Sequence, residues 1–145
     1  MNFKNHIHTK IRNLFSSWLL PARRIHIEFI IESDKVSMHE VAKRIGIEQC
    51  EVRTTFPKNS IAKPYWQVDV KSNDISIEDP LRVLINLLEP KTGVIKEVLA
   101  ELGETPVLGI YTESKWFDRP ILELSHDVLQ FFAQFDSDII FDVNY

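Results

Sequence analysis

Residues 25–46 read IHIEFIIESDKVSMHEVAKRIG and pass from a period-2 pattern to a helical one. In the first eight residues, His26, Glu28 and Glu32 alternate with the apolar Ile25, Ile27, Phe29 and Ile31, which is typical of a strand with one buried face. Ser37 then precedes an amphipathic stretch, Glu40 follows three residues later as in a capping box, and Gly46 is a typical helix end. The pattern predicts a strand and a capped helix, followed by a second strand at Cys50–Phe56.

The end of the chain repeats this order of elements. Ile121–Leu124 is apolar enough to form a strand, and Ser125 precedes a second amphipathic stretch. Asp127 falls in the first turn of that predicted helix, where the helix dipole favours an acid. Asp138–Tyr145 alternates again, with Phe141 expected on its apolar side. The two copies predict two strand-helix-strand units in one fold.

The middle of the chain supplies the remaining elements. Alternation in Cys50–Phe56 and Tyr65–Lys71 predicts a hairpin with a long polar connection. Apolar residues then recur at helical spacing from Ser76 to Leu102, but Pro90 interrupts them. An interior proline removes a backbone hydrogen bond and clashes with the preceding turn, so we expect a kinked helix or two helices that meet at Glu89–Pro90.

These elements, with a strand at Val107–Glu113, follow the order strand-helix-strand-strand-kinked helix-strand-strand-helix-strand. We therefore predict one α+β domain over residues 25–145, with a mainly antiparallel sheet of about six strands and helices packed on one face. The large apolar residues on the covered sides should form the core: Trp66, Leu84, Leu88, Leu129, Phe132 and Phe141.

Four motifs in this order are specific enough to compare with known domains. They are the strand with Trp66, the break at residues 88–90, the segment Leu-Ser-x-x-Val-Leu-x-x-Phe-x-x-Phe at 124–135, and the closing strand at 138–145. In these motifs the chain resembles the bacterial domain-of-unknown-function family numbered 4279, over about residues 25–145. The resemblance implies a small α+β domain without an established activity, so it transfers no catalytic residue.

Composition favours a globular protein of a reducing compartment. The chain has 145 residues, of which 44% are hydrophobic and 26% charged. This length can bury a sizeable core. Cys50 is the single cysteine, which excludes an intramolecular disulfide, and we expect a cytoplasmic location.

Charge is unevenly distributed along the chain. Residues 1–24 carry five basic and no acidic side chains, so the net charge of −4 leaves −4 − 5 = −9 for residues 25–145. The acidic part favours a basic protein partner and argues against nucleic acid. Residues 1–24 form a basic extension with an amphipathic helical pattern. Docking of residues 1–21 on protein is favoured over contact with a membrane, and the longest apolar run is too short for an export signal.

No chemical signature appears in the sequence. His6 and His8 are separated by one residue but have no third ligand nearby, the other three histidines are scattered, and the four glycines stand singly. Neither a metal-ligand spacing nor a phosphate-binding loop is present, so we expect no catalytic residue, no metal site and no cofactor.

Surface recognition is the remaining source of function. Strict alternation in the strands leaves one sheet face polar and open, a composition that suits a wet protein interface. Exposed aromatic residues beside an arginine are typical anchors of such interfaces. The candidate partner-binding residues are the aromatic turn Trp116, Phe117 and Arg119, and the open-face residues Tyr65, Gln67, Asp69, Glu28 and Asp142.

The function expected from these features is that of a noncatalytic protein-binding module, in its most specific form an immunity protein that neutralises a basic toxin domain. A small-ligand-binding or oligomeric structural domain is the alternative, and a deep apolar cavity would favour it. A cryptic hydrolase is the third hypothesis. It would require His26 or His126 to meet Asp138 or Asp142 in one cleft.

Overall fold

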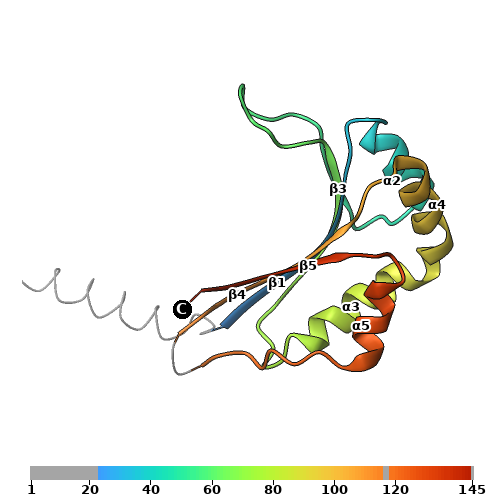
Figure 1. The fold of residues 1–145 in the computed structure, drawn as a ribbon. Coiled ribbons are helices and arrows are strands. Elements are labelled where there is room, and N and C mark those ends of the chain that lie inside the picture. Colours follow the sequence, from blue (N-terminus) through green and yellow to red (C-terminus); the bar gives the residue numbers. More distant parts are fainter. Residues whose placement is uncertain (1–22, 116–117, 145) are drawn as a thin grey trace, which may run out of the picture.

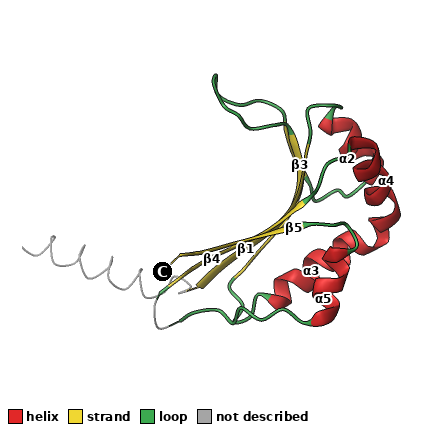
Figure 2. Cartoon of the chain, in the orientation of Figure 1, coloured by secondary structure: helices red, strands yellow, loops and turns green. Residues whose placement is uncertain are grey.

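The computed structural model describes residues 23–115 and 118–144. A curved sheet forms one layer and helices form the other (Figure 1). The elements are, in chain order, β1 (Arg23–Glu32), α2 (Met38–Ile45), β2 (Glu51–Arg53), β3 (Tyr65–Ser72), α3 (Glu78–Leu88), the 3-10 helix η1 (Glu89–Lys91), α4 (Thr92–Leu102), β4 (Val107–Ser114), α5 (His126–Ala133) and β5 (Asp138–Asn144). The prediction of an α+β domain with helices on one face is confirmed (Figure 2).

The sheet has five strands in the order β2-β3-β1-β4-β5, rather than about six. Its neighbouring pairs are antiparallel except β4 and β5, which run parallel. The predicted strand at Ile121–Leu124 is wrong. Its backbone bonds to the segment before α3 instead, with the Ile77 amide donating to the Ile121 carbonyl at 3.1 Å and the Ile121 amide to the Ile75 carbonyl at 2.7 Å. These bonds satisfy Ile121 outside the sheet, so no sixth strand forms there.

The two predicted strand-helix-strand units exist, but the second begins at a different strand. The first is β1-α2-β2, in which β3 lies between two strands that run in the same direction. The second is β4-α5-β5, whose strands are direct neighbours. The first strand of the second unit is therefore Val107–Ser114, not the apolar segment next to α5.

The core lies between the sheet and the helices. Trp66, Leu84, Leu88 and Phe132 are buried as predicted. Two core predictions are wrong, because Leu129 is 39% exposed and Phe141 is 45% exposed. On α5 the buried residues are Val128 and Phe132, so Leu129 lies outside the buried stripe. Phe141 lies on an edge strand, where only one neighbouring strand covers it.

The limits of α2 and the start of α5 lie where the sequence predicts them, although the expected side-chain capping bonds do not form. Ser37 and Ser125 occupy the N-cap positions of α2 and α5, but neither makes a side-chain capping bond. The Ser37 carbonyl accepts the Glu40 amide at 3.0 Å, and Gly46 ends α2 in the left-handed conformation with φ 67°. The kink at Pro90 is confirmed, since η1 separates α3 from α4.

Candidate functional site

The sheet face opposite the helices is concave, and none of the described helices covers it (Figure 1). The candidate residues of β1, β3 and β5 lie on this face. Directly paired residues of neighbouring strands share a face, so the register defines its members. In β1, Glu28 pairs with Asp69 of β3 and with Gly109 of β4. In β5, Asp142 pairs with Tyr111. We call this surface the open face.

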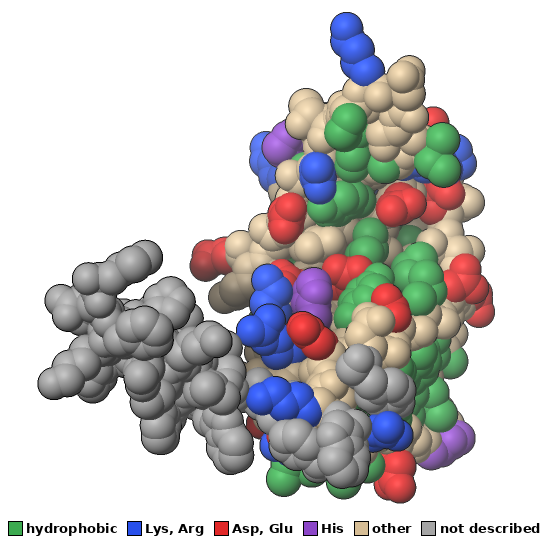
Figure 3. Space-filling model, turned by 90° about the vertical axis from the view of Figure 1, so that its left-hand side faces the viewer, with side chains coloured by type: hydrophobic (Ala, Val, Ile, Leu, Met, Phe, Trp, Pro, Cys, Tyr) green, Lys and Arg blue, Asp and Glu red, His purple; other side chains and the backbone are tan. Residues whose placement is uncertain are grey.

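Carboxylates outnumber basic side chains on the open face. By register it carries seven acidic residues, Glu28, Glu32, Glu51, Asp69, Glu113, Asp138 and Asp142, against the basic Arg24, Arg53 and Lys71 and the histidine His26. In Figure 3, acidic and basic side chains gather around a histidine near the centre of the view. The open face is therefore polar, charged and acidic in sum.

A histidine links the acidic residues at the centre of the open face. His26 Nε2 lies 3.2 Å from Asp69 Oδ2 and 3.8 Å from Glu28 Oε2. Lys71 Nζ lies 3.5 Å from the same Asp69 oxygen. The Glu28 side chain is only 12% exposed, whereas that of Lys71 is 74% exposed. Asp69 thus contacts both His26 and Lys71, and the Glu28 side chain is much more buried than that of Lys71.

Tyr111 covers the middle of the open face because Gly109 has no side chain. A Cβ atom at Gly109 would lie 2.6 Å from Tyr111 Cε2 and 2.9 Å from Glu28 Cγ. Glycine therefore lets the ring lie across β4 and lets the hydroxyl donate a hydrogen bond to Glu28. Burial raises the pKa of Tyr111 to about 12, and the hydrogen bond to Glu28 and the charges of Glu28 and Asp142 act in the same direction.

We expect Tyr111 to ionise near pH 12 in the folded protein. Its tyrosinate absorbance is the part of the titration signal that is absent in Tyr111→Phe. An unfolded tyrosine titrates at about 10. The contribution of Tyr111 to stability is complete below pH 10 and is lost as pH rises through 12, because the tyrosine of the unfolded state releases its proton at a lower pH than that of the folded state. The measurement is an ultraviolet pH titration of the wild type minus that of Tyr111→Phe. A difference midpoint at the ordinary value would contradict the described position of Tyr111.

The predicted site residues fall into two groups. Glu28, Tyr65, Gln67, Asp69 and Asp142 all lie on the open face, on β1, β3 and β5. Gln67 is only 8% exposed, and its side-chain amide donates to Glu51 Oε2 at 3.4 Å. Its side chain therefore contacts Glu51 and is largely shielded from solvent.

The predicted aromatic turn is a different case. Trp116 and Phe117 lie outside the described residues. Arg119 is exposed in the connection that follows them. Nearby, Asp118 forms an ion pair with Arg23 at the start of β1.

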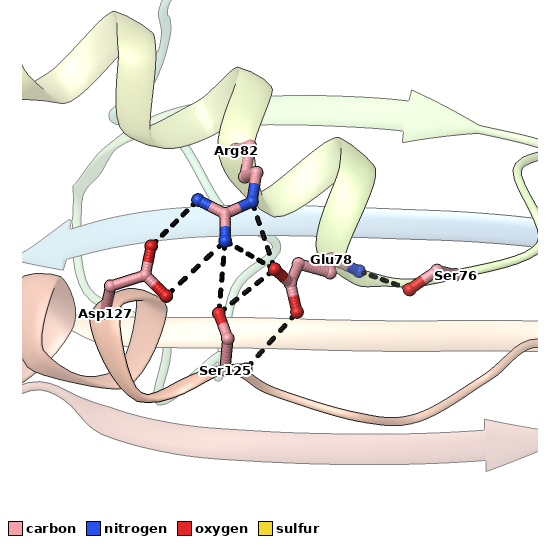
Figure 4. A network of polar contacts seen from close by, with 5 residues as sticks. All are labelled: Ser76, Glu78, Arg82, Ser125 and Asp127. Carbon is pink, nitrogen blue, oxygen red and sulfur yellow. Dashed lines mark hydrogen bonds and ion pairs between the residues drawn. The ribbon is translucent and has the colours of Figure 1, made fainter.

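A second polar cluster lies at the beginnings of α3 and α5 (Figure 4). Arg82 contacts Glu78 one turn earlier, with Nε to Oε1 at 3.0 Å, and Asp127 of α5, with a nitrogen to Oδ2 at 2.9 Å. The Ser125 hydroxyl donates to Glu78 at 3.0 Å. Arg82, followed by Ser125, lowers the pKa of both Glu78 and Asp127, whose carboxylates it stabilises. Because all its members are exposed or half-buried and paired, this cluster fastens the two helices together.

Neither a metal site nor a ligand cavity of metabolite size stands out in the part of the chain that the structure describes. Within it, no group of three or more histidine, cysteine or carboxylate side chains could hold a metal ion. A cleft of about 50 Å³ lies between α2 and α4, lined by Val36, Glu40, Val41, Arg44, Val98, Glu101 and Leu102. That volume is room for a few water molecules. In the described residues, no helix is long and apolar enough to cross a membrane.

The comparisons with known proteins identify a family. A family described as a domain of unknown function (DUF4279) matches residues 23–145. The chain belongs to this family. No curated protein and no solved structure matches the chain.

Two features of this DUF4279 domain were missed by sequence reasoning. The contribution of β4 to the open face was not predicted, although the spacing of Gly109 and Tyr111 puts both on one face of a strand. The Arg82 cluster was also missed. Glu78 and Arg82 have the i, i+4 spacing of a helical ion pair, which the sequence shows, but Asp127 joins them only through tertiary packing.

Proposed function

We propose that this DUF4279 domain is a noncatalytic protein-binding module that binds a basic protein partner on its open face. The observation that carries the proposal is the excess of carboxylates on one concave face that the helices leave uncovered. Such a face attracts a cationic surface at long range and leaves polar groups available for hydrogen bonds at contact.

The arrangement at the centre of the open face supports recognition. Tyr111 offers an aromatic ring beside Glu28 and His26, and Asp69 Oδ2 lies 3.2 Å from His26 Nε2 and 3.5 Å from Lys71 Nζ. Paired side chains hold their positions before binding, which reduces the entropy that a partner must overcome. In this proposal the proximity of His26 and Asp69 serves electrostatics.

In its most specific form, the domain is an immunity protein that neutralises a basic toxin domain in the cytoplasm of the producing cell. Small size, an acidic body and a concave polar face fit a protein whose task is to cover a cationic active site. The partner class follows from charge: residues 25–145 carry −9, so a basic partner gains the most from association.

The test is co-expression with the product of the adjacent upstream gene. That product should arrest growth when expressed alone, and the wild-type domain should restore growth. A variant with Asp69→Lys and Asp142→Lys should protect less than one with Glu97→Lys and Glu40→Lys, which changes the net charge equally on helices of the opposite layer. If the upstream product is harmless, or its toxicity is unaffected, the immunity proposal is wrong and the ligand-binding alternative takes precedence.

A further inference from the structure

The outer edge of β5 is unusual for a sheet edge. β5 has seven residues, and three consecutive large apolar residues, Ile139, Ile140 and Phe141, are 40%, 47% and 45% exposed. Within the described residues, β5 pairs with β4 on one side only. Proteins normally protect such edges with short strands, charges, proline or bulges, because free backbone groups there can bind another strand.

The opposite edge of the sheet shows that protection. β2 has three residues, and its outer members Glu51 and Arg53 are charged. The connection that follows it contains prolines at 57 and 64. β5 contains neither proline nor a basic residue. β5 does carry the charged residues Asp138 and Asp142, but they flank three consecutive apolar residues on a longer strand, so the centre of the β5 edge is available for pairing.

The exposed apolar residues of β5 lie on both faces of the sheet. Ile139 and Phe141 pair with Leu108 and Ile110, whose side chains lie on the helix side, whereas Ile140 pairs with Gly109 on the open face. A partner laid on one face would cover only one of the two sets. A strand added at the edge covers both, because its own side chains flank β5 above and below.

We propose that β5 pairs with β5 of a second copy of this chain, antiparallel, with Phe141 opposite Phe141, so that two five-stranded sheets become one continuous sheet. In this register Ile139 faces Val143, Ile140 faces Asp142, and Asp138 faces Asn144. All seven residues of β5 are paired, and no two carboxylates lie directly opposite each other.

Charge selects this register over its neighbours. A pair centred on Ile140 would put Asp138 opposite Asp142 twice, and a pair centred on Asp142 would put the two Asp142 carboxylates together. Like charges directly opposite each other destabilise a strand pair. Only the register centred on Phe141 therefore pairs all seven residues of β5 without placing two carboxylates opposite each other. This contact lies along the outer edge of β5 and shares Ile140 and Asp142 with the border of the open face. Its test needs no basic partner.

Sedimentation of the full-length wild type should give twice the 16.9 kDa of one chain at micromolar concentration. Phe141→Lys and Phe141→Glu should each give the mass of a single chain, and an equimolar mixture of the two should again give a dimer. The mixture should dimerise because the mixed dimer places opposite charges at its symmetry centre. Circular dichroism should show an unchanged fold in each variant, because Phe141 is 45% exposed.

Cysteine cross-linking tests the register. In a Cys50→Ala background, Phe141→Cys should form an intermolecular disulfide under mild oxidation, because directly opposed Cα atoms lie about 4.5–5.5 Å apart. Ile140→Cys is the matched control, since its exposure is similar but its copy lies diagonally, at about 7–8 Å. Cross-linking through Ile140→Cys instead would overturn the register. A monomeric wild type at high micromolar concentration, or a dimer that Phe141→Lys leaves intact, would overturn the proposal.

Discussion

Replacing Phe29 with alanine should lower the free energy of unfolding by about 3–5 kcal/mol. Phe29 lies on β1, the central strand of the sheet, and is completely buried. Its ring centroid lies 5.5 Å from that of Phe135 and 6.2 Å from that of Phe132, both from the α5 region. Removing the ring takes away these contacts and leaves a cavity between two layers that neighbouring side chains can only partly fill.

Phe141→Ala is the matched control for this substitution. It makes the same chemical change on the same side of the sheet, but at a position that is 45% exposed on an edge strand. We expect a loss of about 1 kcal/mol or less when unfolding is measured on dilute protein, where association between copies does not contribute. Urea unfolding followed by circular dichroism measures both variants. Equal losses would show that β5 is covered in solution to the same extent as β1.

The outcome for Phe141 shows what periodicity can and cannot predict. Alternation identified the buried residues of β1, and in β3 it identified Trp66 and Val68, because the helices cover this face of the central strands. In β3, Val70 is only half-buried and Gln67 is buried on the opposite face. The same alternation in Asp138–Asn144 predicted burial that the structure does not show. Whether a strand is central or at an edge depends on pairing between distant segments, and a local pattern does not contain that information.

Strand identity failed for a related reason at Ile121–Leu124. Three apolar residues and Glu123 before a helix are compatible with a strand, yet Ile121 bonds to the segment before α3. The strand that pairs with β5 lies further back, at β4. The local sequence predicts α5 and β5, but tertiary contacts determine which strand forms the first element of their strand-helix-strand unit.

The open face was predicted residue by residue where alternation alone sufficed. Glu28, Asp69 and Asp142 were assigned to it correctly as members of separate strands. Their arrangement across the sheet was not predicted, because strand order is not a local property. Tyr111 and Gly109 were missed for this reason: only the position of β4 between β1 and β5 brings the ring between Glu28 and Asp142.

If the open face binds a basic partner, charge reversal there should slow association about tenfold or more. Asp69→Lys with Asp142→Lys changes the charge of the face by +4, at two positions on opposite sides of β1. Long-range attraction raises the association rate of oppositely charged proteins by about 10–1,000-fold, and reversing the charges removes part of this gain. Dissociation depends on short-range contacts, so its rate should change much less.

The measurement is stopped-flow association with the basic partner at several salt concentrations. For the wild type, the association rate should fall steeply as salt screens charges over about 8–10 Å, and for the reversed variant the dependence should be weak. Glu97→Lys with Glu40→Lys provides the control, because it changes the net charge equally but on the helix layer. Equal slowing by both variants would mean that only the total charge matters. A larger effect of the open-face reversal locates the attraction on the strands around Tyr111, since the two variants carry the same net charge and differ only in where that charge lies.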